Sequence, residues 1–218
     1  MVRPASADRV KFLAGTLAIV NFLAHAAVAR RADPSPAFVL GAVLPDLLPM
    51  AGVRLDRTEV PDDVAAGWAE HHRADAAFHT SLTFVSGVGA LRTDLRATDL
   101  TTGPRRAAAH VGWELLLDDA VAGDLATIDG FRAALHEGRR ISDDPRWHGL
   151  LDRFAAIRPS APSDTSVIAE RVQRACSRRP RLAFDDHHLA SLAAVLADHR
   201  DTVLAVAPAL LDEVASAT

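Results

Sequence analysis

The sequence has one cysteine, one lysine and no tyrosine, and each scarcity excludes a class of protein. The single thiol, Cys176, forms no disulfide within the chain and no cysteine-ligated zinc site. Aromatic residues make up only 5% of the chain, which disfavours a β-sandwich core and a surface that stacks nucleic-acid bases. Lys and Arg number 24 against 28 Asp and Glu, so the chain is not a globally basic nucleic-acid binder, and we expect no nucleic-acid partner.

Alanine and leucine dominate the 218 residues, and their spacing is helical almost throughout. No stretch alternates in the way that half-buried strands require. The length suits one domain, so we expect a single all-α domain over 1–218, a bundle of eight to nine helices. The expected helices lie near 8–31, 35–51, 62–79, 81–97, 104–121, 124–137, 144–157, 164–178 and 186–215, the last interrupted at Pro208.

An uncharged run near the N-terminus, 12–29, has three interpretations. It is a buried core helix, a membrane span at the short limit of length, or a secretory signal with a small-x-small cleavage pattern at 24–26. The last alternative makes 1–20 a signal-like extension. We favour the core helix because Asn21 and His25 share a helical face, which is costly in lipid and useful in a site. A cytoplasmic protein follows from this choice, and membrane association is not favoured.

A histidine-rich segment lies in the predicted helix 62–79. His71, Asp75 and His79 follow at i, i+4 and i+8, and His72 is an alternative to His71 on nearly the same face. Two imidazoles and a carboxylate on one face can hold a divalent metal. The alternative is a solvated polar face.

Two further elements carry carboxylates in apolar surroundings. On the predicted helix 104–121, His110, Glu114 and Asp118 follow at i, i+4 and i+8, either as site residues or as a wet face. Asp46 stands alone inside an apolar run, where an ionised carboxylate needs a cation or strong donors. Its alternative role is a helix cap after Pro45.

Together these elements offer metal-ligand side chains from several helices toward one bundle interior, as helical metalloproteins commonly do. Histidine and carboxylate without thiolate suit Mn, Fe or Zn and do not choose between them. The predicted metal ligands are His25, Asp46, His71, Asp75, His79 and His110.

Several motifs resemble those of one known family. The run Asn21-Phe22-Leu23-Ala24-His25, the segment from Gly41 to Asp46, the pattern His71-x-Arg73-x-Asp75 and the Arg-rich turn 177–182 are similar, in order and spacing, to motifs of the acyl carrier protein phosphodiesterase family. The resemblance implies an all-α, HD-like metal hydrolase that releases phosphopantetheine from a carrier protein.

The chain departs from that family at three positions. Trp113 is followed by Glu114 and Leu115, without the family's histidine, and histidines occupy positions 79 and 110, where the family is often acidic. These changes concern the ligands and the substrate more than the fold.

A second resemblance ranks below the first. The Leu-Pro-Asp motif ending at Asp46, the pair His72-Arg73 and the segment 78–82 are similar to motifs of predicted membrane-bound metal-dependent hydrolases. The chain lacks the several long apolar spans usual in those proteins.

The sequence thus favours a metal-dependent phosphodiester hydrolase that activates a water. Glu114 and His72 are expected to handle protons, and Arg73 to grip the phosphate. Arginines in 171–181 form either a docking surface for an acidic carrier protein or a solvated helix end. The alternatives are a membrane-associated hydrolase of a lipid or small phosphoester, and a non-catalytic helical binding protein.

Overall fold

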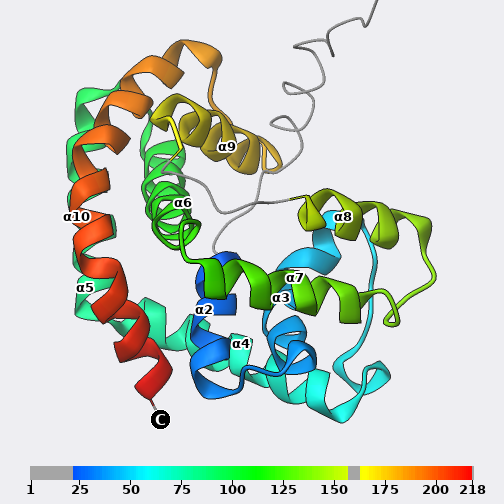
Figure 1. Cartoon of the computed structure of the whole chain (residues 1–218). Helices are drawn as coiled ribbons and strands as arrows, with labels where there is room; N and C mark the ends of the chain where they lie inside the picture. The colour runs from blue at the N-terminus through cyan, green and yellow to red at the C-terminus, as the bar shows by residue number, and fades with distance from the viewer. Residues whose placement is uncertain (1–21, 157–162, 218) are drawn as a thin grey trace, which may run out of the picture.

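The computed structural model describes residues 22–156 and 163–217, and within these ranges all regular structure is helical (Figure 1). This confirms the predicted all-α class. The start of the expected first helix, the signal-like segment 1–20 and Asn21 lie outside the described residues. None of the helices in the described ranges is both long and apolar enough to cross a membrane.

Nine α-helices and three short 3₁₀ turns lie in the described ranges. The α-helices are α2 (Phe22–Ala32), α3 (Pro36–Ala51), α4 (Asp62–Thr80), α5 (Leu82–Asp94), α6 (Thr102–Val121), α7 (Leu125–Gly138), α8 (Pro145–Ala155), α9 (Thr165–Ser177) and α10 (Leu189–Ser216). The expected interruption at Pro208 is wrong, because α10 continues through it. Buried residues on both sides of the proline, Val203 and Leu211 among them, hold the helix against its neighbours.

Aspartates begin several of these helices. The side chains of Asp124, Asp144 and Asp164 accept hydrogen bonds from amides in the first turns of α7, α8 and α9. These bonds satisfy amides that have no partner inside the helix and place negative charge at the positive end of the helix dipole.

The helices form two groups around α2 (Figure 1). Helices α5, α6, α9 and α10 pack on one side, and α3, α4, α7 and α8 on the other. Helix α2 contacts members of both groups, and its residues from Phe22 to Ala29 are all buried. A histidine in this helix therefore faces protein on every side.

Helices α3 and α4 cross in close contact at two glycines. A Cβ on Gly41 would lie 2.0 Å from the carbonyl oxygen of Val64, and one on Gly67 would lie 2.0 Å from that of Phe38. Only hydrogen fits at these two positions. The crossing brings Ala42, one residue beyond Gly41, against His71, one turn beyond Gly67.

Candidate metal centre

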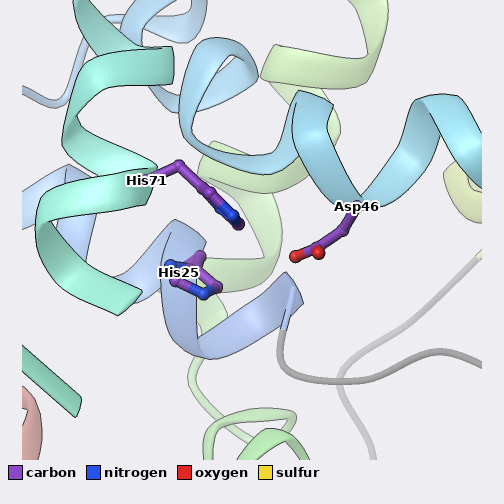
Figure 2. A group of neighbouring side chains, drawn as sticks. All are labelled: His25, Asp46 and His71. Atoms are coloured by element: carbon purple, nitrogen blue, oxygen red, sulfur yellow. The ribbon is translucent and has the colours of Figure 1, made fainter. Parts of the chain in front are cut away.

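Three side chains from three helices converge in the interior. His25 comes from α2, Asp46 from α3 and His71 from α4, and Figure 2 shows them pointing toward one another. Each offers one ligand atom, and these atoms all lie within 4.8 Å of one another. That spacing is compatible with a single ion bound by all three residues.

His71 is fixed by the backbone of α3. Its Nδ1 lies 2.9 Å from the carbonyl oxygen of Ala42. A carbonyl only accepts, so Nδ1 carries the proton and Nε2 keeps a free lone pair. This is how metal-binding histidines are commonly oriented, with one nitrogen held by a carbonyl and the other facing the ion.

His25 is buried, and no residue in 22–156 or 163–217 forms a hydrogen bond with its Nδ1. Its ring centroid lies 4.3 Å from that of His71 and 5.7 Å from that of Phe78, which is roughly perpendicular to it. Burial lowers the pKa of His25 well below its usual value, and the neighbouring His71 and His79 lower it further. Burial also lowers the pKa of His71. Both imidazoles are therefore neutral at pH 7, the form that binds metal.

Asp46 lies inside α3, so the alternative of a helix cap is wrong. Its Oδ2 is buried and has no hydrogen-bond partner among the described residues. Burial raises the pKa of Asp46 to about 8, helped by the nearby acids Asp118 and Glu114. A buried polar atom without a partner is rare in a folded protein, and a bound cation would provide one both here and at His25.

A second group lies beside the first. His79, His110 and Glu114 also offer ligand atoms within 4.8 Å of one another. His110 Nε2 is 3.1 Å from Glu114 Oε1, and the rings of His79 and His110 stack with centroids 5.0 Å apart. The hydrogen bond from His110 to Glu114 raises the pKa of His110. Glu114 is buried, whereas His79 is exposed, so this group opens toward solvent.

Asp75 is half-buried on α4 and borders the second group. Its Oδ1 lies 3.3 Å from His79 Nε2. Its charge also acts on Asp46 and His110, which belong to different groups. Asp75 thus lies near both groups, but it is a ligand in neither trio.

One residue of the centre is not among the predicted metal ligands. Asp118, on α6, is buried and accepts a hydrogen bond of 2.9 Å from the amide of Ala24. Burial raises the pKa of Asp118 to about 7. This bond holds α2 at the residue just before His25. The spacing from Glu114 predicted the shared face, but the contact with α2 depends on tertiary packing.

Two expected catalytic residues, His72 and Arg73, belong to neither trio, although the His72 ring packs against that of His71 with centroids 5.3 Å apart. His72 is exposed, and Trp68 Nε1 donates to its Nε2 over 3.2 Å. Arg73 Nε donates to Glu70 over 2.7 Å, and its Nη1 donates to the carbonyls of Val214 and Ala217. Arg73 therefore joins α4 to the end of α10. The expectation that it grips phosphate does not fit this placement, because Nε, Nη1 and Nη2 each donate to a partner within the fold.

Comparisons of the chain with protein-family models, with curated proteins and with solved structures found no match.

Proposed function

We propose that the protein is a hydrolase that uses divalent metal to cleave phosphodiesters. The observation that carries the proposal is the trio His25, Asp46 and His71. In the part of the chain that the structure describes, His25 and Asp46 have buried polar atoms without partners, and the bond from His71 Nδ1 to Ala42 leaves the Nε2 lone pair of His71 free. Burying polar groups without hydrogen-bond partners costs free energy, so three such side chains at one point of an apolar core favour a bound ligand that satisfies them.

The first cation would be held by His25, Asp46 and His71, and a second by His79, His110 and Glu114. In this proposal Glu114 is a ligand, whereas the sequence suggested a proton carrier. Mixed imidazole and carboxylate donors suit Mn, Fe or Zn. When bound, a divalent cation lowers the pKa of water toward neutrality and offsets charge on a phosphoryl group.

The reaction we propose is ordinary hydrolysis of a phosphodiester. The oxygen of water bonds to phosphorus, one ester P–O bond breaks, and the departing alkoxide takes up a proton to leave an alcohol and a phosphomonoester. The resemblance to acyl carrier protein phosphodiesterases suggests the phosphopantetheine link of an acidic carrier protein as the substrate. A cytoplasmic location belongs to the same proposal.

Metal analysis of protein purified without chelators tests the centre. We expect one to two divalent ions per chain, and loss of the first in Asp46→Asn and His71→Ala. His136→Ala is the matched control, because His136 is an exposed histidine on α7, outside both groups. Full metal content in the Asp46 and His71 variants would refute the site.

Activity is tested separately, with bis(p-nitrophenyl) phosphate and with a holo-carrier protein. Hydrolysis that chelation abolishes and added metal restores supports the proposal. Bound metal without hydrolysis of either compound would indicate a structural ion in a non-catalytic protein. Cleavage of the small diester alone would support phosphodiester hydrolysis and exclude the carrier protein as the substrate.

A further inference from the structure

Two neighbouring hollows border the proposed centre. The first has a volume of about 350 Å³ and lies among the end of α3, the first half of α6 and the end of α9. The second, about 500 Å³, lies among α5, α6 and the turn after α9. Both hollows are lined by Ala107, Val111, Arg179 and Leu182, so they adjoin along one face of α6. We call the combined depression the α6 cleft.

The α6 cleft reaches both ligand groups. Asp46, from the first trio, lines one hollow, and His110, from the second, lines the other. A molecule lying along the cleft would therefore pass both groups. The size of each hollow is within the range of ligand-binding pockets.

The cleft is bordered by unpaired positive charge. Arg178 and Arg179 line the first hollow, and Arg92, Arg106 and again Arg179 line the second. Among the described residues no carboxylate or carbonyl pairs with any of these four guanidinium groups, whereas Arg31, Arg73, Arg139 and Arg146 have such partners. Unpaired arginines beside a cleft favour an anionic ligand, and the planar guanidinium matches the oxygens of a phosphoryl group.

The rest of the first hollow is largely apolar. Pro45, Pro49 and Met50 from α3 face Ala107 and Val111 from α6. Cys176 also lines it, and burial raises the pKa of its thiol to about 11, so the thiol is neutral at pH 7. This surface suits an extended, uncharged chain better than a second charged group.

We infer that the α6 cleft binds the substrate of the proposed hydrolase, with Arg179 holding the phosphoryl group and the apolar wall of the first hollow holding an extended uncharged substituent. Cleavage of the bound molecule rests on the proposed function, whereas binding of a phosphoryl group in the cleft does not. The substrate class it names is a phosphodiester with one long, weakly polar arm. Arg179 is the specificity-determining residue, because it alone among the arginines lines both hollows.

Binding of inorganic phosphate to the metal-depleted full chain tests Arg179 without any need for activity. We expect Arg179→Gln to weaken phosphate binding about tenfold or more, since it removes charge-assisted hydrogen bonds. Arg179→Lys should recover part of the affinity. Arg181→Gln is the matched control, because it removes the same charge from the same turn at an exposed residue outside both hollows. Equal weakening by Arg179→Gln and Arg181→Gln, or no weakening by Arg179→Gln, overturns the role of Arg179.

The apolar arm is tested on the metal-loaded enzyme with p-nitrophenyl phosphodiesters that carry a methyl or an octyl group. We expect the octyl compound to have the lower KM, and Val111→Asp to remove that difference. Equal KM values for the two compounds in the wild-type protein would refute the binding of an apolar substituent in the first hollow.

The two proposals fail in different ways. Phosphate binding that depends on Arg179 in a protein that takes up no metal would sustain the anion site and refute the hydrolase. Normal metal content and an unchanged KM in Arg179→Gln would refute the cleft and leave the hydrolase intact.

Discussion

The imidazole of His71 donates its Nδ1 proton to the carbonyl oxygen of Ala42, 2.9 Å away on the neighbouring helix. This carbonyl lies in the interior of α3, four residues before Asp46 in the sequence. The bond depends on how closely α3 and α4 approach. The backbone crossing thus determines which nitrogen of His71 faces His25 and Asp46.

Widening that crossing should remove the metal before it unfolds the protein. In Gly67→Ala the new Cβ would meet the carbonyl of Phe38 at 2.0 Å, so the helices must separate. We expect a loss of about 1–3 kcal/mol in the free energy of unfolding, together with reduced metal content. Urea unfolding and elemental analysis measure the two effects.

Gly89→Ala is the control for this substitution. Gly89 is also helical, but a Cβ there has nothing within 4 Å. Alanine at this position should raise the free energy of unfolding by about 0.5–1 kcal/mol and leave the metal in place. Metal content that is unchanged in Gly67→Ala would show that the crossing does not position the ligands.

The stability of the metal-free protein should fall as the pH rises above about 6.5. The folded state raises the pKa of Asp46 from 3.8 to about 8 and that of Asp118 to about 7, chiefly by burial. Folded protein therefore holds these protons more tightly than unfolded protein, and the resulting stability is complete below about pH 4 and lost as the pH rises through 7 and 8. His25 acts in the opposite sense, because its pKa is lowered, and it destabilises the fold below about pH 6.5.

Comparison with Asp46→Asn isolates the carboxylate. In the presence of a chelator, the variant should be the more stable protein at pH 8, and its advantage should shrink toward pH 5. Added metal should stabilise the wild-type protein increasingly from pH 6 to 8, because the ion replaces the proton on Asp46. Urea unfolding at several pH values measures both trends. Parallel pH profiles for the two proteins would contradict the raised pKa.

Asp118 should matter as a hydrogen-bond acceptor and not as a charge. Asp118→Ala leaves the amide of Ala24 without its partner, and we expect a loss of about 1–3 kcal/mol in the free energy of unfolding. Asp118→Asn keeps a carbonyl oxygen for that amide, so it should cost much less and retain the first metal. A large, equal loss in both variants would point to the carboxylate charge instead.

The sequence predicts most of the helices because helical spacing is a local signal, whereas the proline signal fails at Pro208, where buried residues on both sides keep α10 continuous. The same spacing correctly places Asp75 with His79 and His110 with Glu114, since residues four apart share a helical face. Local spacing does not decide between His71 and His72, which are adjacent. His71 faces the interior because Gly41 lets α3 cross α4 closely, which brings the carbonyl of Ala42 within hydrogen-bond distance of His71.

The roles of three other residues could not be predicted for the same physical reason. The position of Arg73 depends on the end of α10, more than 140 residues away, whose carbonyls take up its Nη1. The role of Asp118 depends on its contact with the start of α2. Whether Arg179 has a carboxylate partner depends on which helices lie near the turn after α9. Spacing along one helix contains none of this information.

Arg73 should contribute to stability and not to phosphodiester hydrolysis. Its Nη1 donates to the carbonyls of Val214 and Ala217 over 2.8 and 2.7 Å, and Arg73→Gln removes both bonds. We expect the free energy of unfolding to fall by about 1–2 kcal/mol, since the site is partly exposed. Metal content and KM for bis(p-nitrophenyl) phosphate should stay at wild-type values in Arg73→Gln, whereas Arg179→Gln should raise KM. A raised KM in Arg73→Gln, with metal content unchanged, would return Arg73 to the substrate site and would mean that its bonds to α10 open when substrate binds.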